Sequence, residues 1–308
     1  MLPSYISFGE ILWDCLPSGR HAGGAPFNVA AHLAQLGEPT ALVSAVGADG
    51  LGEELLRLAE EKAVLTHFIT RSASGLGTGV VQGALDAQGN ATYEILQPVA
   101  WDAITVSKAA ESAAQGAKAL VFGSLAARSP ANLEALATLL AVPGPTRFFD
   151  VNLRFPFGDP HTVFTLAKQA DVLKLNEDEL GLLTAWLHTG TFTHETPQDP
   201  AALPQACQVL AEATGVQTVC VTRGAAGAAL WEAGQLWSAP APPTVVRDTV
   251  GAGDAFMAGL MVGLTRGFAR PHLLEKACAL GAFVASQFGA TPRLPTALVE
   301  GFAAVPTG

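Results

Sequence analysis

The stretch "DTVGAGDAFMAGL", Asp248 to Leu260, places a carboxylate among glycines and alanines at the start of an apolar run. The apolar residues Phe256 and Leu260 lie one turn apart if the run is helical, which predicts a buried helix. The small residues "GAG" before Asp254 leave backbone N–H groups bare at the positive end of that helix. Such a turn can stabilise negative charge that develops during a reaction.

Two interpretations of Asp254 remain open on this stretch alone. In the first, the helix dipole favours the ionised carboxylate, which acts as a general base toward a hydroxyl that attacks phosphorus. In the second, Asp254 follows a glycine turn and caps the N-terminus of an ordinary helix.

Composition narrows the classes of protein. The chain has 308 residues, of which 49% are hydrophobic and 14% charged, as in a compact globular protein. The net charge of −10, without any basic run, excludes nucleic acid and anionic membrane as expected partners. No apolar run reaches the ~18 residues of a membrane span. The four cysteines show no C-x-x-C spacing, which predicts a reducing, cytoplasmic location: Cys15, Cys207, Cys220 and Cys278.

Short apolar runs alternate with longer amphipathic ones, which predicts a mostly parallel sheet covered by helices on both faces. The expected strands are "YISFG", "TALVSAV", "ALVFGSL", "RFFDVNL", "DVLKLN" and "QTVCVT", followed by the hairpin "GAALWE" and "GQLWSAP". The expected helices are 27–36, 52–62, 132–140, 162–169, 177–187, 203–213, 255–266 and 271–287.

Two segments break this alternation. "ILWDCLPSGRHAGG" follows the first strand, and "TGVVQGALDAQGNATYEILQ" alternates like strands, with a Gly–Asn turn near its middle. Together they predict a small β lid over one edge of the sheet, formed by about residues 10–22 and 76–98.

Several catalytic motifs are absent. The sequence has no G-x-x-x-x-G-K-[ST] phosphate loop, no H-E-x-x-H, no Cys/His zinc spacing and no G-x-S-x-G nucleophile elbow.

Two further constellations each have a structural and a functional interpretation. In "GGAPFNVAAHLAQLG", Gly23 to Gly37, paired glycines allow close approach to a ligand and Asn28 could bind hydroxyl groups; the alternative is a tight turn before an amphipathic helix. In "KLNEDEL", Asn176 and Glu179 either form a capping box or hold metal-bound waters beside a phosphate.

Taken together, the three constellations resemble the ribokinase-like carbohydrate kinases, the PfkB family. "GGAPFNVA" with the later Gly37 and Gly47 is similar to the N-terminal signature of that family, "DTVGAGDAFMAGLM" to its C-terminal signature, and Asn176–Glu179 to its N-x-x-E. The resemblance covers nearly the whole chain and implies one domain, 1–308, folded as a three-layer α/β/α sandwich with a β lid. "GEILWDCLP", "GGAPFN" and "FDVNLR" look most like fructokinases.

The resemblance also implies roles for single residues. Asp254 would be the catalytic base, and the N–H groups of Gly251, Ala252 and Gly253 the anion hole. The other implied residues bind sugar (Asp14, Gly23, Gly24, Asn28, Asn152 and Arg154), ATP (Asn176, Thr222, Gly224, Gly227, Gly251 and Gly253) or Mg²⁺ through water (Asn176 and Glu179).

Two departures from the family pattern concern selectivity and ions. Gln97 stands near the place where many bacterial fructokinases carry a lid arginine. Asp248 matches a monovalent-cation position that would take K⁺, but Arg293 falls where a small hydroxyl residue often sits. The exposed edges of the lid strands would let two copies pair as a homodimer.

The leading hypothesis is a phosphotransferase that uses ATP and Mg²⁺ to phosphorylate a primary hydroxyl of a monosaccharide, fructose above all. 2-Keto-3-deoxygluconate kinase is the first alternative, because "D-x-N-x-R" is shared, and ribokinase and then nucleoside kinase follow. A hypothesis of another class is a non-catalytic sugar or nucleotide sensor, which would be expected to lose the base or the glycine turn.

Overall fold

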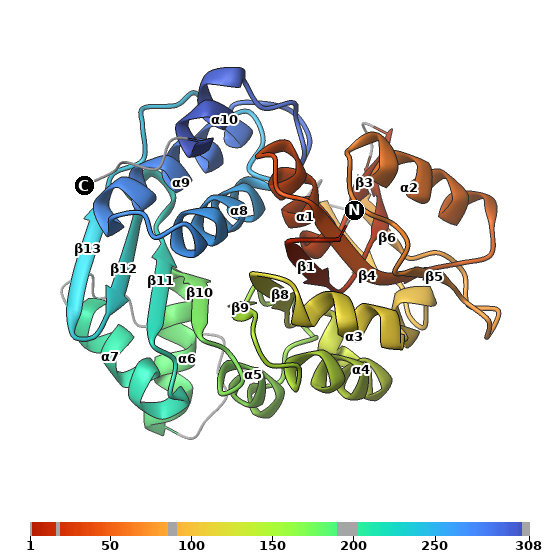
Figure 1. Ribbon diagram of the computed structural model, residues 1–308, viewed down its shortest axis with the longest axis horizontal. Coiled ribbons are helices and arrows are strands. Elements are labelled where there is room, and N and C mark those ends of the chain that lie inside the picture. The colour runs from red at the N-terminus through yellow and green to blue at the C-terminus, as the bar shows by residue number, and fades with distance from the viewer. Residues whose placement is uncertain (1, 17–18, 86–90, 190–202, 304–308) are drawn as a thin grey trace.

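A computed structural model describes residues 2–16, 19–85, 91–189 and 203–303 as a nine-stranded sheet flanked by helices and a separate four-stranded sheet (Figure 1). The order of strands in the large sheet is β13-β12-β11-β10-β9-β8-β1-β4-β5. Neighbouring strands from β11 to β5 are parallel, whereas β12 and β13 pair in antiparallel fashion.

The bounds of these strands are β1 Tyr5–Phe8, β4 Thr40–Val46, β5 Ile69–Arg71, β8 Ala119–Gly123, β9 Thr146–Asp150, β10 Val172–Asn176, β11 Thr218–Thr222, β12 Ala228–Glu232 and β13 Gln235–Ala239. All eight predicted strands are present, and only the three-residue β5 was not anticipated, since its pattern is too short to stand out.

Helices cover both faces of the sheet, which confirms the predicted three-layer sandwich. One face packs against α1 Ala25–Gln35, α2 Gly50–Glu61, α8 Ala252–Thr265, α9 Arg270–Ala285 and α10 Thr296–Ala303. The other packs against α3 Lys108–Gln115, α4 Pro130–Leu140, α5 Pro160–Ala167, α6 Glu177–Thr189 and α7 Leu203–Thr214. Helices α3 and α10 were not predicted; α3 buries only alanines, so it carries no periodic pattern of large apolar residues. Among the described residues, none of these helices is long and apolar enough to cross a membrane.

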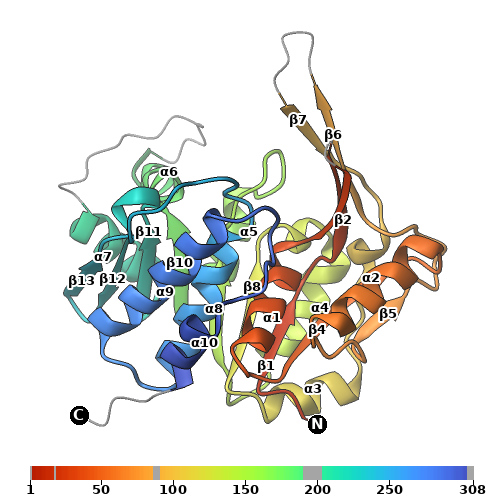
Figure 2. The same cartoon turned by 90° about the horizontal axis from the view of Figure 1, so that it is seen from above.

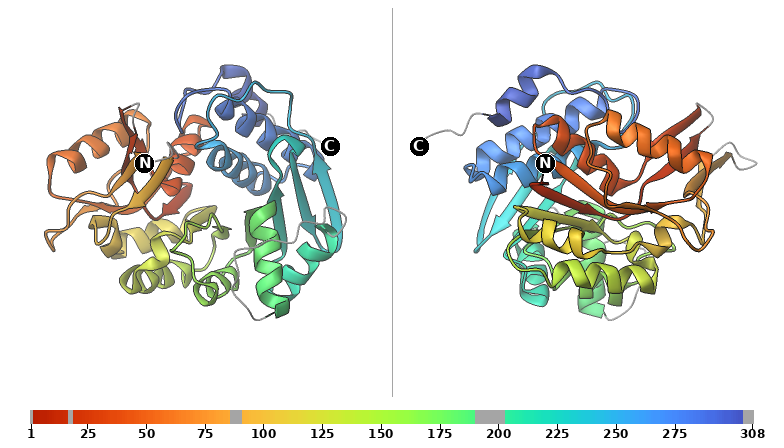
Figure 3. Two further views of the ribbon diagram at one scale, coloured as in Figure 1. Left: turned by 180° about the vertical axis from the view of Figure 1, so that it is seen from behind. Right: turned by 45° about the vertical axis from the view of Figure 1, so that its right-hand side comes forward.

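The small sheet has the order β3-β2-β6-β7, with β2 Leu12–Leu16 parallel to β6 Val80–Leu85. β3 Gly19–Gly23 and β7 Ala91–Ile95 form its edges. These strands lie in the two segments expected to form a lid, while the expected Gly–Asn turn, 89–90, lies outside the described residues. In Figure 2, β6 and β7 extend away from the large sheet. Figure 3 shows the small sheet and α2 at one end of the molecule and the β12–β13 hairpin at the other.

The order of strands reverses at β1, because the next strand of the large sheet, β4, pairs with one side of β1 and β8 with the other. In open parallel sheets, ligands bind outside the carboxyl ends of the strands at such a reversal. The segments after β1, β8 and β9 and the N-terminus of α1 meet there, so the fold itself indicates where a site should lie.

Candidate active site

The two glycine-rich segments meet at the start of α8. Asn28 on α1 donates from Nδ2 to Oδ2 of Asp254 over 2.8 Å, across 226 positions in the sequence. Both side chains are buried. Helix α1 begins after Gly24 with a proline in its first turn, so Asn28 lies one turn into the helix and faces α8.

The interpretation of Asp254 as a helix cap is wrong. The N-cap of α8 is Gly251, with φ 80° and no side-chain cap hydrogen bond, and Asp254 is the third residue of the helix. Its carboxylate is directed to Asn28 rather than to the N–H groups of its own first turn. Because Gly251 tolerates the left-handed backbone, it ends the turn without help from a capping side chain.

Burial opposes the effect of the helix start on the ionisation of Asp254. Burial raises the pKa of Asp254 to about 6, from a usual value of 3.8, and the nearby Asp150 carboxylate acts in the same sense. The hydrogen bond from Asn28 and the positive charges of Lys174 and Arg154 oppose this rise. Loss of water around the charge is therefore the largest single influence on the pKa of Asp254.

The turn before α8 is packed against the segment that follows α9. A Cβ on Gly251 would overlap the backbone carbonyl of Ala290. The N–H of Ala252, expected to point into the anion hole, donates to the Thr249 carbonyl over 3.2 Å. N–H groups at the start of a helix lack a partner four residues back, which leaves Gly251 and Gly253 as candidate anion donors, and the anion hole stays a prediction.

The predicted sugar residues lie around the N-terminus of α1. Gly24 has φ 106°, and a Cβ there would come within 2.5 Å of the Glu10 carbonyl oxygen, so only glycine fits. A Cβ on Gly23 would overlap the carboxylate of Asp14, which lies on the neighbouring strand β2. Burial raises the pKa of Asp14, while the positive charges of His21 and Arg154 lower it.

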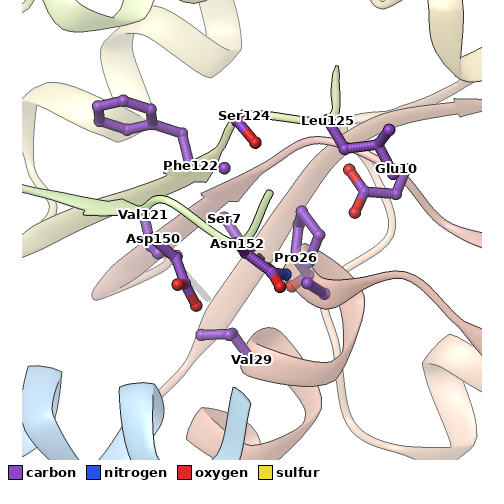
Figure 4. A pocket seen from close by; sticks show the side chains of 12 residues that line it. Ser7, Glu10, Pro26, Val29, Val121, Phe122, Ser124, Leu125, Asp150 and Asn152 are labelled. Carbon is purple, nitrogen blue, oxygen red and sulfur yellow. Dashed lines mark hydrogen bonds between the residues drawn. The ribbon is translucent and has the colours of Figure 1, made fainter. Parts of the chain in front are cut away.

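Asn152 and Arg154 follow β9. Asn152 has φ 39°, a left-handed conformation that asparagine tolerates better than most residues, and it lines a cavity of about 20 Å³ with Glu10 and Ser124 (Figure 4). Within the described chain, Oε2 of Glu10 and Oγ of Ser124 have no hydrogen-bond partner. Arg154 is exposed, donates to the Leu153 carbonyl over 3.0 Å and lies close enough to Glu10 and Asp254 to lower their pKa values.

Asn176 and Glu179 form the reciprocal capping box at the start of α6. The N–H of Glu179 donates to Oδ1 of Asn176 over 2.8 Å, and the N–H of Asn176 donates to Oε2 of Glu179 over 2.9 Å. Oε1 of Glu179 accepts the N–H of Leu153 over 2.8 Å, which ties α6 to the segment that carries Arg154. The structural interpretation is therefore realised, and the metal interpretation stays a prediction.

The predicted nucleotide residues lie beside this cap. Thr222 ends β11 directly opposite Asn176 on β10. Gly224 begins the turn η4 Gly224–Ala226 and Gly227 follows it, with φ values of 52° and 91°. A Cβ on Gly227 would overlap the Ala239 carbonyl.

Asp248 stands apart from the residues around Asp254 and joins two loops. Its Oδ1 accepts the N–H of Val250 over 3.0 Å, and its Oδ2 that of Gly289 over 3.1 Å.

Three buried ionisable side chains around Asp254 were not singled out from the sequence. They are Glu10, Asp150 and Lys174, each less than a tenth exposed. The sequence feature that could have identified them is an isolated ionisable residue within or at the end of an apolar strand, as in "FFDVN" and "VLKLN". Within the described ranges, no group of three or more His, Cys, Asp or Glu side chains is arranged to hold a metal ion.

The pfkB family carbohydrate kinase pattern matches residues 15–297. The chain is 29% identical to a fructokinase of Klebsiella pneumoniae, over 83% of this chain and 82% of that protein. It is 28% identical to an aminoimidazole riboside kinase of Salmonella typhimurium, over 93% and 90%. The structure of a fructokinase from Xylella fastidiosa with bound ATP is similar, with a TM-score of 0.82, 25% identity and 98% of both chains covered.

Proposed function

The chain belongs to the pfkB family of carbohydrate kinases, and on this premise we propose that it transfers the γ-phosphoryl group of ATP to a primary hydroxyl of fructose. The observation that carries the proposal is the contact between Asn28 and Asp254, because it joins the two glycine-rich segments at one helix start. The relatives named fructokinase support the choice of sugar.

Asp254 is the proposed general base. A buried carboxylate with a pKa of about 6 is mostly ionised at neutral pH and is a better proton acceptor than an exposed one. It takes the proton of the attacking hydroxyl as that oxygen approaches the γ-phosphorus. The N–H groups of Gly251 and Gly253 and the positive end of α8 take up charge on the transferring group.

The sugar is proposed to lie against the N-terminus of α1. Oδ1 of Asn28 is buried and has no hydrogen-bond partner among the described residues, so it can accept a sugar hydroxyl while Nδ2 holds Asp254. The half-buried carboxylate of Asp14, packed on Gly23, offers a second acceptor. Gly24 lets the backbone approach the ligand closely.

ATP is proposed to lie along Asn176, Thr222, Gly224 and Gly227. Four exposed apolar side chains, in two segments that are joined through Asp248, offer a surface for a planar base: Val245, Val246, Val250 and Phe288. The nucleotide is proposed to bind with Mg²⁺, which neutralises phosphate charge when bound.

Glu179, with Asn176, is the proposed protein partner of that ion through water. Its two oxygens each accept one backbone N–H and keep lone pairs for water ligands. A single carboxylate fits an ion that Mg·ATP brings with most of its own ligands. Each carboxylate oxygen of Asp248 already accepts one backbone N–H, so only the remaining lone pairs of these oxygens could bind K⁺.

The small sheet is proposed to act as a lid on a single domain. Closure over the sugar would exclude water, which otherwise competes for the phosphoryl group. The edge strands β3 and β7 could pair with those of a second copy. Cytoplasmic location is part of the same proposal, since ATP and reduced thiols are both at hand there.

2-Keto-3-deoxygluconate is the second candidate substrate, and Arg154 is the observation that favours it. The guanidinium is exposed beside the carboxylates of Glu10, Asp14 and Asp254, where it could meet a substrate carboxylate. Ribose and aminoimidazole riboside follow, the latter because of the relative that acts on it.

A coupled assay of ADP release tests the substrate directly. We expect the highest kcat/KM with fructose in a panel with 2-keto-3-deoxygluconate, ribose, aminoimidazole riboside and adenosine. Asp254→Asn should lower kcat by orders of magnitude and leave binding of sugar and ATP nearly intact. A strong preference for the keto acid would refute the choice of fructose, and turnover within about tenfold of wild type in the Asn variant would refute the base.

A further inference from the structure

A buried ion pair lies beside the turn that precedes α8. Lys174, on β10, donates from Nζ to the two carboxylate oxygens of Asp150, on β9, over 3.0 and 2.9 Å. Their exposed fractions are 6% and 4%. The two residues are direct neighbours across the parallel strands, so the backbone fixes the position of the pair.

The ammonium of Lys174 reaches the turn itself. A Cβ built on Gly253 would lie 3.3 Å from Nζ, so the missing side chain is what allows the cation to come this close. Gly253 is one of the residues proposed to bind the transferring phosphoryl group. A positive charge at this depth is screened far less than one at the surface.

Asp254 is surrounded by charged and polar groups from several elements. They are Glu10 after β1, Asn28 on α1, Asp150 on β9, Arg154 after β9 and Lys174 on β10. A neighbouring anion raises the pKa of a carboxyl group and a neighbouring cation lowers it. Asp150 and Lys174 therefore act on Asp254 in opposite directions.

Stability alone does not account for this pair. Buried ion pairs can often be replaced by apolar residues without loss of stability, because removing two charges from water costs about as much as their attraction returns. Here the pair lies beside the reacting groups rather than in a remote part of the core. Its position points to a task in the reaction.

We propose that Lys174 and Asp150 are a positioning pair for phosphoryl transfer: Lys174 supplies a fixed positive charge to the Gly253 turn, and Asp150 holds that charge in place. This inference rests on the function proposed above. Both residues act through Gly253 and Asp254, so neither is called catalytic.

The first test measures Asp254 in the free protein. The side-chain carboxyl carbon of Asp254 is titrated by ¹³C NMR in wild type, Asp150→Asn and Lys174→Met, and is assigned with Asp254→Asn. We expect the pKa to fall in Asp150→Asn and to rise in Lys174→Met, each by about half a unit or more. A pair whose charges were screened from Asp254 would give no such opposite shifts.

The second test measures catalysis in the double variant Asp150→Asn/Lys174→Met. This variant removes both charges of the pair together, so neither is left buried without the other, and we expect it to fold and to unfold thermally near the wild-type temperature. Its kcat should fall about tenfold or more, because the turn has lost the ammonium. If a single variant fails to fold, the kcat of the double variant alone tests the proposed role of the pair.

The matched control is a largely buried pair, Arg128 and Asp102, which is joined by two hydrogen bonds of 2.7 and 2.9 Å. Asp102→Asn/Arg128→Met should leave both the Asp254 pKa and kcat unchanged. A Lys174/Asp150 double variant with kcat within about twofold of wild type, or single variants whose shifts share one sign, overturns the inference. Wild type that phosphorylates no sugar refutes the proposed function, while the NMR titration still tests the pair.

Discussion

The hydrogen bond between Asn28 and Asp254 allows a quantitative prediction. Asn28→Leu keeps the volume of the buried side chain and removes the donor that lies 2.8 Å from Oδ2 of Asp254. A hydrogen bond to a charged group contributes about 1.5–3 kcal/mol, and one pKa unit corresponds to about 1.4 kcal/mol. The pKa of Asp254, about 6 in the wild type, should therefore rise by about one to two units.

The assay is the pH dependence of kcat/KM, which reports the ionisation of the free enzyme. With the base protonated over a wider range, kcat/KM of Asn28→Leu at pH 6 should fall about 5- to 50-fold more than at pH 9. Asn28 is also proposed to bind the sugar, so a uniform loss at every pH is expected as well. The position of the acidic limb, rather than the height of the curve, is the diagnostic quantity.

Asn132→Leu is the matched control. Asn132 is also fully buried and makes three hydrogen bonds, to Ile104, Trp101 and Ala126. Its loss should lower stability and leave the acidic limb in place. If the limb of Asn28→Leu stays within about 0.3 units of wild type, the hydrogen bond does not hold the charge of Asp254 and the reasoning is refuted.

Three further predictions concern the same site. Because the pKa of Asp254 is raised from 3.8 to about 6, the stability that protonated Asp254 contributes is present below pH 4 and is lost as pH rises through 6. Asp254→Asn should therefore be more stable than wild type by up to about 3 kcal/mol at pH 8 and by little at pH 4, as measured by chemical unfolding. Gly251→Ala should abolish turnover, because the new Cβ would overlap the Ala290 carbonyl. Gly289→Ala, at the same φ of 80° but in open space, should cost only about 1–2 kcal/mol of stability. Equal kcat values of these two variants would contradict this prediction. Glu179→Gln places the donor group of the amide opposite a backbone N–H, so one of the two hydrogen bonds is lost and the free energy of unfolding should fall by about 1–3 kcal/mol. A metal titration should show that this variant needs more Mg²⁺ to reach its half-maximal rate.

The elements of the large sheet could largely be predicted because each carries its own local signal. Buried parallel strands such as 40–46 are mainly apolar runs, and a glycine turn followed by an apolar run predicts α8. Helix α3 was not predicted because it buries only alanines, and β5 was not predicted because it has only three residues. The capping box at Asn176 was also visible, since its two partners are three positions apart.

By itself, the sequence determined the fold class, the family and the segments that would meet, because those depend on periodicity and on glycines at fixed spacing. Only the tertiary structure decided the state of Asp254. A helix start favours a lowered pKa, yet burial and the nearby Asp150 raise it to about 6 against the opposing effects of Asn28 and Lys174. Desolvation depends on every chain segment that excludes water from a group, and those segments are distant in the sequence. The charge on the carboxylate in "GAGD" is therefore a property of the assembled fold.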